Sequence, residues 1–369
     1  MFVLVVAIYC YLFYPQQSMP IGVAASLETP EFEKYRNDCL HPCIRYDSIN
    51  DIYHMAQSPY YGWNNKVENP IYYTSELYMQ WENGMLLANT PEYGFNSDPC
   101  ILLDGDSVLY VWRECGTPRC DSLGVVSATV GGFVRDGRIN DIKMFVSNTS
   151  HDYDIQQCPI LMKRNRGGQC VENQQDSVFI YAAWYQYNPE RISNGVAIWQ
   201  GSSIKKPDFK LIDTLRLPSM YTVDKMAQLR LFDYIWYLPM PKKHDVWHFD
   251  LFEYKDKLYM VSVAEKGDNI MLSVSDDYRH FRHIRKPLVN NHYSENYTGY
   301  RQYFYKPTAF VKNDSLFVFY TANAKDDPNR NQLFVTAEKI DKIINPLAEL
   351  NQRIFDSSNG FIVNKVNIL

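Results

Sequence analysis

The chain has 369 residues, enough for a substantial hydrophobic core in one large domain or two ordinary ones. Its net charge of −5 and pI near 5.9 argue against a nucleic-acid partner, because such proteins carry a basic footprint. Apolar residues make up 46% of the chain and the mean hydropathy is −0.36, values typical of a soluble globular protein. Aromatic residues are frequent, at 15%, which favours strands and also suits surfaces that bind sugars.

The chain opens with the apolar run "MFVLVVAIYCYLFYP". This run is shorter than the about 20 residues that a membrane-spanning helix needs, but it fits the apolar region of a signal peptide. "GVAAS" at Gly22 to Ser26 is a passable cleavage site, although no positive charge precedes the run. Residues 1–25 are therefore predicted to be a signal peptide or an N-terminal anchor. The protein is expected in the periplasm or at the cell surface, or in the cytoplasm if the run is not a signal.

The cysteines do not predict a disulfide framework. Beyond Cys10 their number is odd, although the pair Cys115 and Cys120 and the pair Cys158 and Cys170 could each close a small loop. No CxxC pair and no His/Cys spacing indicates a zinc site.

A pattern recurs along the chain. Each copy has a polar residue, usually followed by proline, then an apolar strand, a turn with Asp, Asn or Gly, and an aromatic-rich strand. The copies start at His41, Asp98, Cys158, His248 and Lys306. Most continue into a third strand, and helical periodicity is nearly confined to Ile340–Leu350. We therefore predict an all-β fold, a five-bladed β-propeller with three- to four-stranded antiparallel blades. It would span residues 38–345, followed by a C-terminal tail at 346–369; a β-sandwich or two small β domains is the competing interpretation.

In a propeller the first strand of each blade lines the central channel, and the second strand returns to the same face. The starts of first strands and the ends of second strands should therefore meet at one end of the channel. The proline that follows fixes φ and helps to aim the preceding side chain inward. Residues expected there are His41, Asp98, Cys158, His248 and Lys306 from the starts, and Glu68, Arg113, Glu114, Glu265 and Lys266 from the ends and their loops. Such a ring of chemically different groups suits an asymmetric ligand.

These motifs resemble a known family. "HPCIRY", "SPY", "ENP", "SDPC", "WRE", "WHFD" and "YRQYFYKP" are similar to sequences of five-bladed propeller glycoside hydrolases of Bacteroidota and related bacteria, distant relatives of glycoside hydrolase family 43 and of the sucrose- and fructan-cleaving propellers. The resemblance covers roughly residues 38–340 and implies a glycoside hydrolase. In family 43 the first inner strand supplies an aspartate as general base, and here that place is taken by His41. Asp98 corresponds to the second-blade aspartate, and the acid glutamate cannot be assigned by position.

Glycoside hydrolysis needs two carboxyl groups that flank the scissile bond. The candidate catalytic residues are Asp98 and Glu68, followed by Glu114. The alternatives are an Asx turn at Asp98 and a solvated loop carboxylate at Glu68. Arg113 and Glu114 point to opposite faces of one strand, so only one of them can face the channel.

Six residues are candidates for substrate binding. The imidazoles of His41 and His248 can hydrogen-bond sugar hydroxyls or be satisfied by the backbone. Arg301 and Lys306 can bind an anionic group or pair with Asp250 or Glu253. The complete set is His41, Arg113, His248, Asp250, Arg301 and Lys306. No cofactor is predicted, although a structural calcium in the channel stays open because related propellers can hold one near a central histidine.

The sequence therefore predicts a glycoside hydrolase that cleaves a bond of a complex polysaccharide by carboxylate acid/base catalysis in the central pocket. Kinship slightly favours the inverting route. The expected partner is an oligo- or polysaccharide, with neither nucleic acid nor an obligate protein partner. The alternative is a non-catalytic carbohydrate-binding propeller or an accessory protein of polysaccharide assembly. Glycosyl transfer to phosphate or to another sugar is a third interpretation, favoured if Arg113, Arg301 and Lys306 form a cationic cluster.

Overall fold

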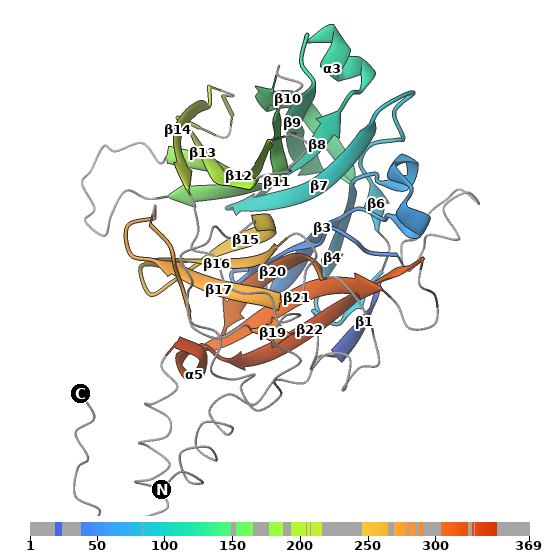
Figure 1. Cartoon of the computed structure of the whole chain (residues 1–369). Helices are drawn as coiled ribbons and strands as arrows, with labels where there is room; N and C mark the ends of the chain where they lie inside the picture. Colours follow the sequence, from blue (N-terminus) through green and yellow to red (C-terminus); the bar gives the residue numbers. More distant parts are fainter. Residues whose placement is uncertain are drawn as a thin grey trace, which may run out of the picture.

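The computed structural model describes residues 19–23, 38–82, 84–148, 153–164, 177–186, 193–203, 205–206, 208–215, 246–264, 269–278, 280–284, 288–290, 304–323, 327 and 329–344. Five small sheets form a ring, with their first strands toward its centre (Figure 1). Within the described ranges no helix is both long enough and apolar enough to cross a bilayer.

The strands of each blade follow one another from the centre outward. Blade 1 contains β2 (Cys43–Asp47), β3 (Ile52–Gln57), β4 (Ile71–Ser75) and β6 (Met85–Leu86). Blade 2 contains β7 (Phe95–Asp104), β8 (Ser107–Cys115), β9 (Ser127–Arg135) and β10 (Arg138–Asn148). Blade 3 contains β11 (Tyr153–Arg164), β12 (Ser177–Gln186), β13 (Ser193–Gly201) and β14 (Lys210–Leu215).

Blade 4 contains β15 (Val246–Tyr254), β16 (Lys257–Ala264), β17 (Asn269–Ser275) and β18 (Arg282–His283), and β19 (Val289–Asn290) also pairs with β17. Blade 5 begins with β20 (Tyr305–Lys312), β21 (Ser315–Asn323) and β22 (Asn331–Lys339). The short helices are η1 (Tyr61–Trp63), η2 (Asn65–Val67), α3 (Pro118–Ser122) and α5 (Ile340–Ile344). The predicted five-bladed propeller is confirmed, and each of the five sequence copies supplies the two innermost strands of one blade.

The outer strand of blade 5 comes from an early part of the chain. β1 (Met19–Val23) runs antiparallel to β22, with Met19 opposite Val335, and parallel to β5 (Gln80–Trp81) of the first-blade segment. This strand closes the ring between the last blade and the first. It falls within the segment predicted to be a signal peptide or anchor, whose other residues lie outside the described part of the chain, as does the predicted tail at 346–369.

Aromatic side chains fill the spaces between neighbouring blades. Trp81 and Tyr73 of the first-blade segment pack with Phe310 and Phe319 of blade 5, and Trp112 lies in the core that joins blades 2 and 3. Part of the high aromatic content is thereby explained by burial of apolar surface between sheets.

Four of the five inner strands are irregular near the residue that opens the repeat. The pairing shifts between Ser97 and Cys100 in β7, and equivalent shifts occur in β11, β15 and β20. Asp98 has φ of +49° and Cys158 has φ of +55°, values that L-residues adopt only at a cost. Each of these two residues precedes a proline, which a bulge tolerates because the missing N–H breaks no regular ladder bond. The bulge thus re-aims the side chain that the repeat places at the strand start.

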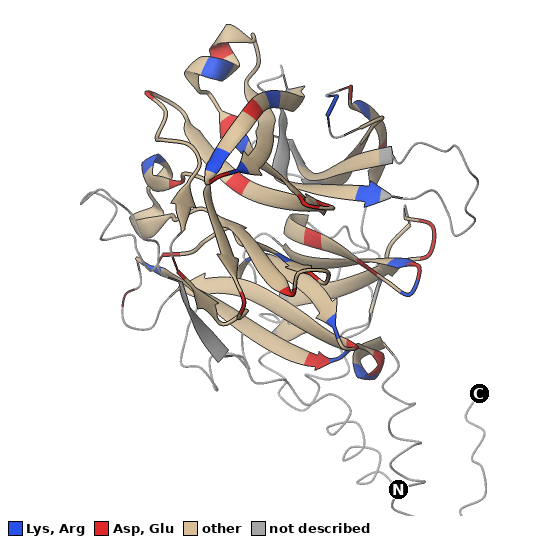
Figure 2. Ribbon diagram, turned by 180° about the vertical axis from the view of Figure 1, so that it is seen from behind, with Lys and Arg blue, Asp and Glu red and all other residues tan. Residues whose placement is uncertain are grey.

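Charged residues lie in turns and along the strands (Figure 2). Among them is Arg45 of β2, whose guanidinium bonds both carboxylate oxygens of Asp250 in β15, at 2.6 and 2.7 Å. The Asp250 side chain is fully buried and also accepts a hydrogen bond from the hydroxyl of Thr308 in β20. This contact joins the inner strands of blades 1, 4 and 5.

We expect the Arg45→Met substitution to lower the free energy of unfolding by about 3–5 kcal/mol, because it leaves the buried carboxylate of Asp250 without its cation. The measurement is urea unfolding followed by circular dichroism. Lys257→Met is the matched control: its ammonium also lies 2.6 Å from a carboxylate, that of Asp276, but both side chains are exposed. Equal losses in the two variants would contradict a special role for the buried pair.

Candidate functional site

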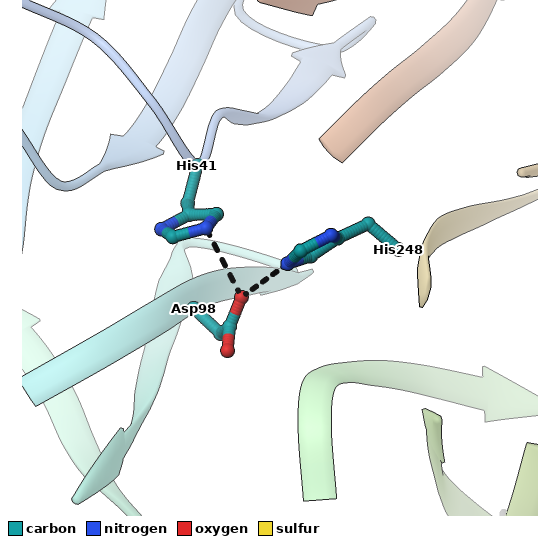
Figure 3. Close-up of side chains that lie close together, drawn as sticks. All are labelled: His41, Asp98 and His248. Atoms are coloured by element: carbon teal, nitrogen blue, oxygen red, sulfur yellow. Dashed lines mark hydrogen bonds and ion pairs between the residues drawn. The ribbon is translucent and has the colours of Figure 1, made fainter. Parts of the chain in front are cut away.

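Asp98 is the centre of a buried polar cluster. Its side chain is about 2% exposed, and its Oδ1 lies 3.2 Å from Nε2 of His248 and 3.6 Å from Nε2 of His41 (Figure 3). Its Oδ2 lies 3.0 Å from the Ser97 hydroxyl and 3.5 Å from Nε of Arg113. The two oxygens of one carboxylate therefore face different partners, imidazoles on one side and a hydroxyl and a guanidinium on the other.

The propeller brings these partners together from three blades. His41 lies two residues before β2, Asp98 lies in the bulge of β7, and His248 lies at the bulge of β15. Arg113 reaches the same place from β8, where it is the cross-strand partner of Ser97. The starts of inner strands and the end of a second strand thus meet here, as the repeat predicts.

Glu68 is part of this cluster although it comes from a loop. It follows η2, its side chain is about 4% exposed, and its Oε1 lies 2.8 Å from Nδ1 of His41 and 2.9 Å from the Ser97 hydroxyl. The next residue, Asn69, is held by hydrogen bonds with Thr90 and Asn96. The interpretation of Glu68 as a solvated loop residue does not fit this geometry.

Burial and neighbouring charges shift the pKa values of Glu68 and Asp98 in opposite directions. Burial raises the pKa of Glu68 well above its usual range, and the negative charge of Asp98 adds to this effect. Burial also opposes ionisation of Asp98, but His41, His248 and Arg113 together hold its pKa well below its usual range. The Ser97 hydroxyl contacts both carboxyl groups but has only one proton to donate. If it donates to Asp98, a protonated Glu68 can donate to the Ser97 oxygen in turn.

Both histidines of the cluster are uncharged near neutral pH. Burial lowers the pKa of His41 and that of His248 to about 4, although the charge of Asp98 acts in the opposite direction.

The donor atoms His41 Nε2, His248 Nε2 and an Asp98 oxygen all lie within 4.8 Å of one another, so these three residues could hold a metal ion. The sequence analysis predicted no zinc site and left open only a structural calcium near a central histidine, because the spacing of these residues along the chain matches no short metal motif.

Glu114, the third candidate catalytic residue, lies outside the cluster. Its carboxylate accepts a hydrogen bond from Thr117, the N-cap of α3, and lies 3.5 Å from Nε of Arg119. Arg113, its neighbour on β8, is the residue of this pair that reaches Asp98. Of Arg113 and Glu114, only one of which could face the channel, Arg113 is therefore the one that does so.

The remaining candidates have other surroundings. Lys306 is fully buried and donates to the carbonyl of Pro99, and Asp250 is engaged by Arg45 and Thr308. Arg301, Glu265 and Lys266 lie outside the described residues. Of the predicted cationic cluster, Arg113 and Lys306 both carry their charge close to His41 and Asp98, and the third member, Arg301, lies outside the described residues.

Three aromatic rings border the cluster and were missed as site residues. Tyr305 lies 5.0 Å from Trp247 and 5.7 Å from Trp63 between ring centroids, and Trp247 lies 4.9 Å from His248. Trp63 is 45% exposed. The sequence does hold a clue to two of these rings, because Trp247 and Tyr305 each directly precede a residue that opens a repeat copy. Such rings can pack against the apolar face of a sugar.

Comparison with solved structures supports the fold. The chain is similar to an N-acetylgalactosamine deacetylase from F. plautii, solved in complex with blood group B trisaccharide, with a TM-score of 0.62 and 12% identity over 94% of this chain and 100% of that chain. It is also similar to a GH43_1 enzyme from Xanthomonas citri, with a TM-score of 0.50 and 7% identity over 90% of this chain and 92% of that one.

A third similar structure is an exo-1,5-alpha-L-arabinanase from a bovine ruminal metagenomic library, with a TM-score of 0.50 and 11% identity over 82% of this chain and 93% of that one. No protein-family model and no curated protein matches the chain. At these identities the likeness concerns the fold, so the resemblance to Bacteroidota proteins stays a prediction.

Proposed function

We propose that the chain is a hydrolase of saccharides that cleaves a glycosidic bond with Glu68 and Asp98. The observation that carries this proposal is the pairing of two buried carboxyl groups from neighbouring segments, both against the Ser97 hydroxyl. Glycosidases need one carboxyl group that stays protonated and a second that stays ionised, and the environments of Glu68 and Asp98 differ in that sense.

In this proposal Glu68 is the acid that protonates the leaving oxygen. Asp98 is the carboxylate that attacks the anomeric carbon or activates water, and Arg113 keeps it ionised. The Ser97 hydroxyl lies 2.9 Å from Glu68 Oε1 and 3.0 Å from Asp98 Oδ2, so these two oxygens are at most about 6 Å apart. That is closer to the about 5–5.5 Å of retaining enzymes than to the wider pairs of inverting ones. This spacing favours retention, whereas kinship with family 43 favoured inversion.

A second candidate is removal of an acyl group from a sugar. It is favoured by the two uncharged imidazoles at Asp98, an arrangement that a glycosidase does not require. The similar deacetylase from F. plautii, matched over its whole length, adds support for this chemistry. The two candidates differ in their products, since one creates a reducing end and the other releases a carboxylic acid.

We expect Glu68→Gln and Asp98→Asn each to lower turnover by at least about 100-fold. The assay incubates the protein with plant and bacterial polysaccharides and with N-acetylated oligosaccharides, and it measures new reducing ends and free acetate separately. Asp104→Asn is the matched control, because Asp104 lies at the other end of β7 and pairs with Lys163; its turnover should stay within about threefold of the wild type.

New reducing ends in the wild type would support the glycosidase, and free acetate without reducing ends would support the second candidate. Glycan binding without either product, unchanged in both variants, would overturn catalysis and favour the non-catalytic carbohydrate-binding propeller.

We expect Trp63→Ala to weaken saccharide binding about fivefold to tenfold, because the exposed ring loses its contact with the apolar face of the sugar. Isothermal titration with an oligosaccharide identified in the turnover assay measures the change. Tyr93→Ala is the control, because Tyr93 is exposed to a similar degree, 43%, and its hydroxyl donates to Asp121 of α3. An equal effect of both substitutions would argue against a sugar contact at Trp63.

A further inference from the structure

Three potential ligand atoms meet at one point of the buried cluster. Asp98 Oδ1 is the common neighbour of His41 Nε2 and His248 Nε2, and both rings turn their edges toward it (Figure 3). All three residues are at most 5% exposed. They come from the inner-strand starts of three blades, so their positions relative to one another are set by the ring.

The distances fit a common ion as well as they fit direct hydrogen bonds. Ligand atoms bound at about 2.0–2.2 Å to one tetrahedral ion lie about 3.3–3.5 Å from each other. The two nitrogen–oxygen distances here are 3.2 and 3.6 Å. All three ligand atoms lie within 4.8 Å of one another, so a bound cation would draw the side chains together.

The groups behind the ligand atoms support the same arrangement. His41 Nδ1 lies 2.8 Å from Glu68 Oε1 and 3.2 Å from the Ser58 hydroxyl, so an N–H at Nδ1 has an acceptor oxygen and leaves Nε2 as a lone pair. A carboxylate behind a ligating histidine is the common arrangement in metal sites. His248 Nδ1 is buried and has no hydrogen-bond partner among the described residues, so no bond there opposes the tautomer with a free Nε2 lone pair.

The surrounding charges also allow a cation. Oδ2 of Asp98 is occupied by Ser97 and Arg113, which leaves Oδ1 free to face the two imidazoles. Arg113 and Lys306 are the positive charges nearest this point, and both act on the carboxylate of Asp98. Lys306 Nζ is directed to the carbonyl of Pro99.

We propose that His41, Asp98 and His248 bind one divalent transition-metal cation of the Zn²⁺, Mn²⁺ or Fe²⁺ class, with Glu68 orienting His41. Two imidazoles and one carboxylate are typical ligands of these ions. Calcium, the alternative from related propellers, takes six to eight oxygen ligands and fits this nitrogen-rich set poorly. A site with three protein ligands keeps a position for water or substrate.

The test uses the whole chain without a polyhistidine tag, stripped with a chelator and dialysed. Zn²⁺ is titrated by calorimetry, and Co²⁺ binding is followed by its visible absorption. We expect about one ion per chain, at least about tenfold weaker binding in Glu68→Gln, and loss of binding in His248→Gln. His280→Gln is the matched control, because His280 also faces an aspartate, Asp277, but is exposed; its binding should be unchanged.

Thermal unfolding of the wild-type chain with and without Zn²⁺ keeps the test independent of how well the variants fold. A Zn²⁺-dependent rise in Tm that is lost in His248→Gln supports the site. No binding to the wild type, undiminished binding in a folded His248→Gln variant, or a preference for Ca²⁺ would overturn it. Because these measurements involve no substrate, failure of the proposed hydrolase activity would leave their outcome unaffected.

Discussion

The buried negative charge of Asp98 is the constraint on which the rest of the candidate site depends. An isolated carboxylate in the interior would cost far more than a protein's net stability, so it must be surrounded by donors or cations. Here the surrounding groups are His41, His248, Arg113 and Ser97, which three different blades supply. The site can therefore form only when the ring has assembled, and its geometry is as precise as the packing of the blades.

The bulges at the strand starts turn a symmetric scaffold into an asymmetric site. Each blade offers the same backbone position near the centre, but the residues there are His41, Asp98, Cys158, His248 and Lys306. The left-handed backbone at Asp98 and at Cys158 is strain that the surrounding strands must hold in place. Deeper along the inner strands, Arg45 and Asp250 bind blades 1 and 4 together, which keeps the cluster's donors in register.

The sequence predicted the fold well because the repeat is a periodic signal. The convergence of His41, Asp98 and His248 followed from propeller geometry alone, since each opens a copy of the repeat. The position of Glu68 depended on how a loop folds back, which strand periodicity does not describe. The choice between Arg113 and Glu114 required the register of β8 against β7.

The partner of Asp250 could not be predicted, because Arg45 is 205 residues away and the contact depends on how two blades are rotated. The role of His41, Asp98 and His248 as potential metal ligands could not be predicted for the same reason. Metal motifs are read from short spacings on one segment, whereas these donors lie on separate blades.

The strand that completes blade 5 has a consequence for the order of folding. β1 pairs with β22, so the earliest and the latest described strands of the chain lie side by side. Contacts between residues so far apart in sequence carry a large loop-closure entropy and form late in folding. During synthesis the first four blades can form their hydrogen bonds as they emerge, but the backbone groups of β1 that pair with β22 stay unpaired until β22 is made. Closure of the circle is thus expected to be the final step of folding.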